Sequence, residues 1–127
     1  MASLLDPIQI GDMHLPNRII MAPLTRLRGT PEHIPTKLMA EYYSQRAGAG
    51  LIVSEGIPVV LQGVGYANVP GIWSPDQVEA WKLVTKAVHG AGGRIFAQLW
   101  HVGRISDPRF LDRKLPVAPS AIRPQAM

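Results

Sequence analysis

The chain has 127 residues, of which 46% are hydrophobic and 17% charged, and it contains no cysteine. This composition is typical of a globular domain with a packed core, and it excludes disulfide bonds and thiolate chemistry. The net charge is +4, but the lysines and arginines are spread along the chain. They form no run of like charges and accompany no nucleic-acid motif, so we expect no nucleic-acid partner.

Targeting and membrane signals are absent from the sequence. The first six residues, MASLLD, lack the basic start and the long apolar stretch of a signal peptide. No apolar run approaches the ~18 residues that a membrane span needs. We therefore expect a cytoplasmic protein that has no membrane partner.

The first predicted elements are a hairpin and a buried strand. Residues 8–10 and 13–15 alternate in hydropathy around Gly11 and Asp12, which favours a β-hairpin. Residues 18–23 form a nearly continuous apolar run, which suits a strand buried on both faces. Pro23 marks the end of this strand, because proline cannot donate to a strand ladder.

Two helices, each followed by a strand, come next. Thr36 is predicted to cap a helix over residues 37–47, which leads into a strand over 51–55. A loop over 56–73 precedes a second helix, whose start carries a capping-box pattern at Ser74, Pro75 and Gln77. Its predicted apolar face consists of Val78, Trp81, Val84, Thr85 and Val88. A strand over 94–99 follows, and residues 115–127 are predicted to be an exposed, proline-rich loop.

The order of elements favours part of a (β/α)8 barrel. The three strands start near residues 18, 51 and 94, which are 33 and 43 residues apart, and a barrel of ~250 residues averages ~31 per repeat. We predict an α/β fold with an N-terminal β-hairpin and the first three βα units of a TIM barrel. A free-standing doubly wound sheet is the alternative, but it would need more strands and a phosphate loop after the first strand.

Standard motifs give no assignment. The chain has no dinucleotide fingerprint after a strand, no Walker A loop and no nucleophile elbow around Ser54. Its four histidines lack metal-ligand spacing, so we expect no metal site.

Polar and aromatic residues instead gather where the strands end. Thr25, the junction of Glu55 and Gly56, and Gln98 with Trp100 lie at carboxyl ends of neighbouring strands, the rim where such folds bind ligands. Parallel strands lie ~4.8 Å apart, so these groups span about 10 Å, enough for a flat fused-ring ligand. On residue types alone, a loop-capping hydroxyl, a core amide and ordinary core packing remain open as explanations.

Several segments resemble one enzyme family in the same order. They are LDPI at 5–8, NRI at 17–19, MAPLTR at 21–26, EYYSQRA at 41–47, GLIVSE at 50–55, PGIWS at 70–74, QLWHVGR at 98–104 and PVAPS at 116–120. Together they resemble the Old Yellow Enzyme family, FMN-dependent ene-reductases with a (β/α)8 barrel. Thr25 in place of a cysteine resembles the branch of the bacterial pentaerythritol tetranitrate and N-ethylmaleimide reductases.

The resemblance implies roles for seven residues. Pro23, Leu24 and Thr25 would lie along the flavin, with the Thr25 hydroxyl bonded to O4 and tuning the flavin. Gly56, where many relatives have alanine, would hold the same edge through its backbone, and Gln98 would bind the pyrimidine edge. Tyr66 and Trp100 would shape the substrate pocket, while His101 and Arg104 would support the rim.

The resemblance also implies a reaction and a missing part. NADPH or NADH would reduce FMN, and hydride would then pass to activated alkenes such as enones or nitroalkenes; some relatives reduce nitrate esters or nitroaromatics. The family's catalytic residues would lie beyond Met127, so no catalytic residue is expected in this chain. A non-enzymatic barrel fragment or interaction module without flavin, and a different barrel enzyme with a phosphate-bearing substrate, are the alternatives.

We therefore expect residues 1–127 to be the N-terminal part of a single FMN-binding TIM-barrel domain. Residues 1–17 would be a hairpin plug at the bottom of the barrel, residues 18–104 the strands and helices, and residues 105–127 a loop tail. We expect a complementary polypeptide with the remaining strands, or self-association, to complete the barrel, because the outer strands would otherwise expose unpaired edges.

Overall fold

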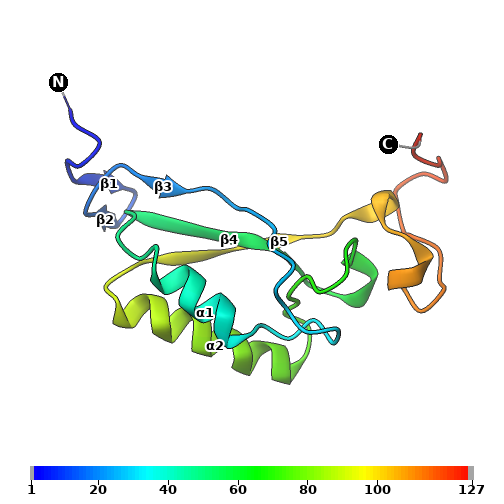
Figure 1. The fold of residues 1–127 in the computed structure, drawn as a ribbon. Helices are drawn as coiled ribbons and strands as arrows, with labels where there is room; N and C mark the ends of the chain where they lie inside the picture. Colours follow the sequence, from blue (N-terminus) through cyan, green and yellow to red (C-terminus); the bar gives the residue numbers. More distant parts are fainter. Residues whose placement is uncertain (1, 126–127) are drawn as a thin grey trace.

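The computed structural model describes residues 2–125, which form a two-stranded hairpin, a three-stranded parallel sheet and two helices (Figure 1). The elements are β1 (Ile8–Ile10), β2 (Met13–Leu15), β3 (Ile20–Met21), α1 (Lys37–Ser44), β4 (Leu51–Pro58), the 3-10 helix η1 (Leu61–Gly63), α2 (Pro75–Gly90), β5 (Ile95–Trp100) and the 3-10 helices η2 (Gly103–Ile105) and η3 (Pro108–Phe110). This order is the predicted one.

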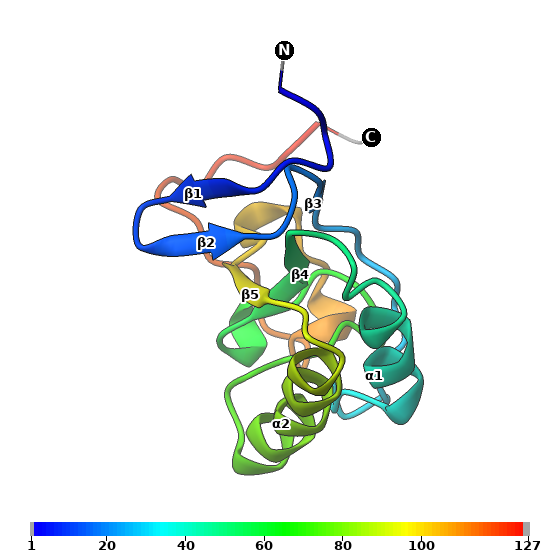
Figure 2. The ribbon, with the colours of Figure 1, turned by 90° about the vertical axis from the view of Figure 1, so that its left-hand side faces the viewer.

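The hairpin lies at the amino ends of the sheet strands. β1 and β2 pair antiparallel with Ile8 opposite Leu15, and Gly11 takes a positive φ of 55° in the turn between them. Asn17 then links the hairpin to the sheet, because its side-chain oxygen accepts a hydrogen bond from the Gly50 amide at 2.8 Å and its nitrogen donates to the Gly48 carbonyl at 2.9 Å. Figure 2 shows this end of the molecule from the front.

The parallel sheet has the order β3-β4-β5, with the long strand β4 in the middle. β3 is shorter than the predicted strand over 18–23: it pairs with β4 only at Ile20 and Met21. β4 is longer than predicted and extends to Pro58, because it pairs with β5 again beyond an irregularity after Val53. Residues 56–58 are therefore strand, and the loop predicted there was wrong.

Helix α1 begins where predicted but is capped differently. Thr36 occupies the N-cap position, yet its hydroxyl donates to the Arg28 carbonyl at 2.8 Å and makes no capping bond. The helix ends at Ser44 rather than at residue 47, since the amides of Arg46 and Ala47 bond to carbonyls three residues back.

Helix α2 has the predicted capping box. The Ser74 hydroxyl accepts from the Gln77 amide at 3.3 Å, and the Gln77 side-chain oxygen accepts from the Ser74 amide at 3.1 Å. The predicted apolar face holds for its centre but not for Val78, which is 38% exposed. Gln77 is buried beside it because its side-chain amide also bonds to the backbone of Trp73 and Glu32.

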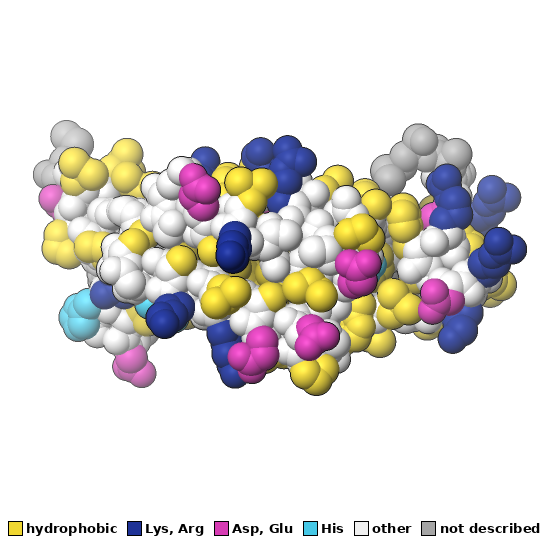
Figure 3. Space-filling view, turned by 60° about the horizontal axis from the view of Figure 1, so that its bottom comes forward, with side chains coloured by type: hydrophobic (Ala, Val, Ile, Leu, Met, Phe, Trp, Pro, Cys, Tyr) yellow, Lys and Arg dark blue, Asp and Glu magenta, His cyan; other side chains and the backbone are white. Residues whose placement is uncertain are grey.

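Both helices cover the same face of the sheet (Figures 1 and 2), and the core lies between these two layers. The buried core cluster consists of Met39, Tyr43, Ile52, Ile57, Trp81, Val84 and Val88. Phe96, whose neighbours Ile95 and Ala97 face the helices, is 50% exposed. Charged side chains of both signs are interspersed on the helix side of the surface (Figure 3).

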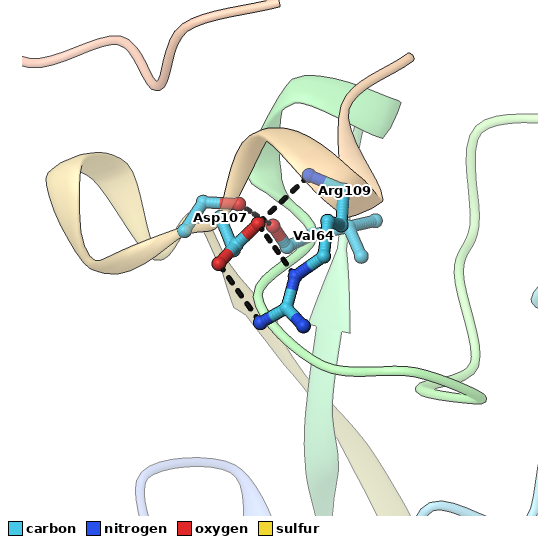
Figure 4. A network of polar contacts seen from close by, with 4 residues as sticks. Val64, Asp107 and Arg109 are labelled. Atoms are coloured by element: carbon cyan, nitrogen blue, oxygen red, sulfur yellow. Dashed lines mark hydrogen bonds and ion pairs between the residues drawn. The ribbon is translucent and has the colours of Figure 1, made fainter. Parts of the chain in front are cut away.

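The segment after β5 is anchored to the segment after β4. The Ser106 hydroxyl donates to the Val64 carbonyl, and Asp107 accepts hydrogen bonds from the Arg109 amide at 2.8 Å and guanidinium at 3.0 Å (Figure 4). The Arg109 guanidinium also holds the pKa of Asp107 below its usual range. Residues 115–125 contain no helix or strand, as their prolines predict. No helix within residues 2–125 has the length and hydropathy that a membrane crossing requires.

Candidate functional site

The predicted site residues lie where the three parallel strands end. β3 and β4 run side by side from the pairs Ile20–Leu51 and Met21–Ile52, so the residues that follow β3, including Thr25, emerge at the carboxyl end of the sheet. Gly56 pairs with Gln98 at the same end of β4 and β5. We call these residues, namely 22–25, Gly56 and residues 98–100, the rim (Figure 1).

A β-bulge shapes the central part of the rim. Val53 pairs with Phe96 and Gly56 with Gln98, so two residues of β4, Ser54 and Glu55, stand opposite one residue of β5. The Ser54 hydroxyl accepts from the Gln98 amide at 3.1 Å and donates to the Glu55 carbonyl at 2.8 Å. A buried side chain thus replaces a ladder bond at the point where Gln98 is positioned.

Gly56, Gln98 and Trp100 share the face of the sheet that the helices leave uncovered. Gly56 and Gln98 are paired, and residues two apart in a strand point to the same side. Ile57, the next residue of β4, packs into the helix-side core, which fixes the direction of the alternation.

The two residues predicted for a substrate pocket are neighbours. The rings of Tyr66 and Trp100 have centroids 6.2 Å apart and are tilted by 31°. The indole of Trp100 also lies against Gly56, where a side-chain Cβ would overlap the ring. The Trp100 Nε1 is buried and has no hydrogen-bond partner among residues 2–125, so this rim holds an unused donor.

Two polar side chains of the rim are also unused. Within residues 2–125, no hydrogen bond joins the Thr25 hydroxyl or the Gln98 side-chain amide to another group. Beside Thr25, Leu24 is 54% exposed and Pro23 is exposed. An apolar surface next to unpaired donors and acceptors fits a flat ring with a polar edge. The residues present therefore fit a flavin, although the Trp100 indole occupies the space beside Gly56.

One buried acid behind the rim was not assigned a role from the sequence. Glu55 is completely buried and faces the helix side, where its Oε1 accepts from the Tyr43 hydroxyl at 3.1 Å and its Oε2 from the Arg26 amide at 3.3 Å. Burial raises the pKa of the Glu55 carboxyl, and these hydrogen bonds partly oppose that rise. An acid inside the apolar run Leu51–Pro58 was the signal that pointed to it.

The remaining polar residues near the rim have internal partners. Arg104 donates to the Ser120 hydroxyl at 2.9 Å and to the Ile122 carbonyl at 3.0 Å, and the His101 Nδ1 accepts from the Gly103 amide at 3.0 Å. Within residues 2–125, no group of three or more His, Cys, Asp or Glu side chains is placed to hold a metal ion. Hollows of about 780 Å³ and 360 Å³ lie away from the rim, beside the tail and beside α1.

A family model decides what kind of protein has this rim. The model of the NADH:flavin oxidoreductase / NADH oxidase family matches residues 3–126. The chain belongs to this family. The flavin oxidoreductases therefore supply the frame for the rim, and the resemblance to Old Yellow Enzymes found in the sequence is confirmed.

Individual relatives agree with the family. A flavin oxidoreductase of Emericella nidulans is 48% identical over 94% of the chain and 32% of its own length. A probable flavin mononucleotide-dependent alkene reductase of Leishmania infantum is 40% identical over 94% of the chain and 33% of its own length.

The fold is that of the N-terminal part of an Old Yellow Enzyme barrel. The solved structure of the Old Yellow Enzyme homologue of Zymomonas mobilis is 56% identical and superposes with a TM-score of 0.91, covering 95% of this chain and 34% of that one. The chain thus spans about a third of the length of the flavin oxidoreductases it matches.

Proposed function

We propose that this chain provides one wall of the FMN site of an Old Yellow Enzyme-type ene-reductase. The observation that carries the proposal is the pair of unbonded polar side chains, Thr25 and Gln98, beside the exposed Pro23 and Leu24 on the rim of a flavin oxidoreductase. When bound, FMN would supply hydride transfer from NADH or NADPH to an activated alkene. The relatives support this class, since one of them is named an alkene reductase.

The residues of this chain would hold and orient the flavin. Pro23 and Leu24 would lie along the ring, and the Thr25 hydroxyl would donate to its O4 edge. The Gln98 amide, which both donates and accepts, would bind the pyrimidine edge. Gly56 would contribute its backbone at the O4 edge, beside the indole of Trp100.

Tyr66 and Trp100 would bound the substrate pocket above the ring. Their tilted stack and the buried, unpartnered Nε1 of Trp100 leave a hydrogen-bond donor for a ligand. We propose enones and nitroalkenes as substrates, with nitrate esters and nitroaromatics as further acceptors. The use of a reduced nicotinamide fits a cytoplasmic location.

The site needs further barrel strands. Within residues 2–125, β3 and β5 each pair on one side only, and the apolar side chains of Phe96 and Leu99 are 50% and 61% exposed. Unpaired edges and uncovered apolar faces favour association with more polypeptide. We propose that strands carried by a complementary polypeptide, or by self-association, cover these faces and add the catalytic residues.

The proposal is tested by colour and by mass. The protein should purify yellow or turn yellow with FMN, and the colour should bleach when NADPH or NADH is added without oxygen. Sedimentation should give a mass above that of the single chain, and a Gln98→Leu variant should retain less FMN. A colourless protein after FMN is added to the complete assembly would support the non-enzymatic alternative. A soluble, cooperatively unfolding monomer would contradict completion by further strands.

A further inference from the structure

A fully buried carboxylate lies directly behind the rim. Glu55 is 0% exposed and immediately precedes Gly56 in β4. It faces α1, whereas Gly56 and Gln98 face the side proposed for the flavin. Glu55 is thus one residue from the rim but has no direct access to a ligand bound there.

The two oxygens of Glu55 serve two different elements. Oε1 accepts from the Tyr43 hydroxyl of α1 at 3.1 Å, and Oε2 accepts from the backbone amide of Arg26 at 3.3 Å. The Tyr43 hydroxyl in turn accepts from the Glu55 amide at 2.9 Å. A carboxylate is the side chain that accepts at two oxygens at once, whereas glutamine has only one acceptor oxygen.

Burial makes this arrangement costly unless the hydrogen bonds are made. Desolvation raises the pKa of Glu55, while the Arg26 amide and the Tyr43 hydroxyl oppose the rise. A residue used only for packing would meet the same space more cheaply as an uncharged side chain. The carboxylate is therefore best explained by the donors that it joins.

The Arg26 amide belongs to the same peptide unit as the Thr25 carbonyl. Fixing this amide fixes the plane of that peptide and limits where the Thr25 side chain can point. The next residue, Leu27, has a positive φ of 56°, which a leucine rarely adopts, so the chain turns sharply where Glu55 holds it. The Arg26 guanidinium also lies 5.3 Å from the centroid of the Tyr42 ring on α1.

We propose that Glu55 is a positioning residue for the proposed flavin site, which holds the Thr25–Arg26 peptide from the helix side of the sheet and thereby directs the Thr25 hydroxyl toward the ring. The inference rests on the proposed function. Tyr43 completes the arrangement by fixing both the carboxylate and the Glu55 amide to α1.

A double-mutant cycle in the complete, flavin-loaded protein tests this role. Glu55→Gln should change the ratio of the dissociation constants for oxidised and reduced FMN by about fivefold, because the Thr25 bond is weakened. In a Thr25→Ala background the same Glu55→Gln change should leave the ratio unaltered. Glu79→Gln, an exposed glutamate on α2, is the control for the same chemical change.

A second measurement does not depend on flavin. Hydrogen exchange of the Arg26 amide should be faster in Glu55→Gln than in the natural protein, and unchanged in Glu79→Gln. If Glu55→Gln does not fold, Glu55→Asp and Tyr43→Phe are carried through the same cycle, since each removes only part of the arrangement. Restoration of the natural ratio in Glu55→Asp would also support the role.

The outcomes separate the two proposals. Equal effects of Glu55→Gln with and without the Thr25 hydroxyl, or no effect in either background, would overturn the positioning role while FMN binding still supports the proposed function. A natural protein that binds no FMN overturns both. Unchanged exchange of the Arg26 amide in Glu55→Gln overturns the positioning role on its own.

Discussion

The indole of Trp100 lies against the α-carbon of Gly56, in the space that a side chain at residue 56 would occupy. Because both residues belong to paired strands, the backbone on either side has little freedom to move. The absence of a side chain at residue 56 therefore sets the position of an aromatic wall of the proposed substrate pocket.

We predict that Gly56→Ala displaces this indole and lowers the free energy of unfolding by about 1–3 kcal/mol, as overpacking in a core does. Urea denaturation followed by tryptophan fluorescence measures both effects. Gly90→Ala is the matched control: its new methyl group meets no atom within 4 Å, and Gly90 ends a helix, so stability should not fall. Equal stability of Gly56→Ala and the natural protein would mean that the indole adopts another position.

Thr25→Ala should lower the two-electron midpoint potential of bound FMN. The hydroxyl hydrogen bond is expected to favour reduced flavin by a net of about 1 kcal/mol, which corresponds to about 20 mV. Equilibration with a reference dye measures the potential, and stopped-flow reduction by NADPH should become slower. Thr85→Ala, on α2, serves as the control. A potential that does not move would show that the hydroxyl makes no contact with the ring.

Ser54→Ala should weaken the rim through the β-bulge. The change removes the acceptor of the Gln98 amide and leaves a donor unpaired, at a cost of about 1–3 kcal/mol in stability. The dissociation constant for FMN should rise, because Gln98 is less firmly held. Chemical denaturation and fluorescence titration with FMN measure the two effects. Ser44→Ala, whose hydroxyl bonds within α1, should change neither by a comparable amount.

The buried Glu55 predicts the direction of a pH effect. Because burial raises its pKa, the folded protein binds this proton more tightly than the unfolded chain does. This contribution is fully present below the ordinary glutamate pKa of about 4.3 and is lost as the pH rises through the folded-state pKa. The stability of the natural protein relative to Glu55→Gln should therefore fall as the pH is raised from about 4. Urea unfolding of both proteins across this range measures the slope, and a rising difference would contradict the prediction.

The two helix N-caps should respond differently to mutation. Ser74→Ala breaks the capping box of α2 and should lower stability by about 1 kcal/mol. Thr36→Ala should cost less, since the Thr36 hydroxyl bonds to the Arg28 carbonyl and does not cap α1. Thermal unfolding of both variants gives the comparison. A larger loss in Thr36→Ala would mean that its bond to the segment after β3 matters more than the cap.

Local features of the fold were predictable because their hydrogen bonds join residues close in sequence. The capping box of α2 spans only Ser74 to Gln77, and the hairpin turns within a few residues of Gly11. Element ends were less predictable. The extension of β4 to Pro58 depends on pairing with β5, about 40 residues later, and the burial of Gln77 in place of Val78 depends on a bond to Glu32.

The sequence alone identified the family, the order of elements and the residues proposed to face a flavin, because these are carried by contiguous motifs and hydropathy. Only the tertiary structure revealed the bulge that ties Ser54 to Gln98, the indole over Gly56 and the carboxylate of Glu55 behind Thr25. These contacts join residues 29 to 44 positions apart. Such pairs arise when strands and helices pack, and no local pattern of residues encodes them.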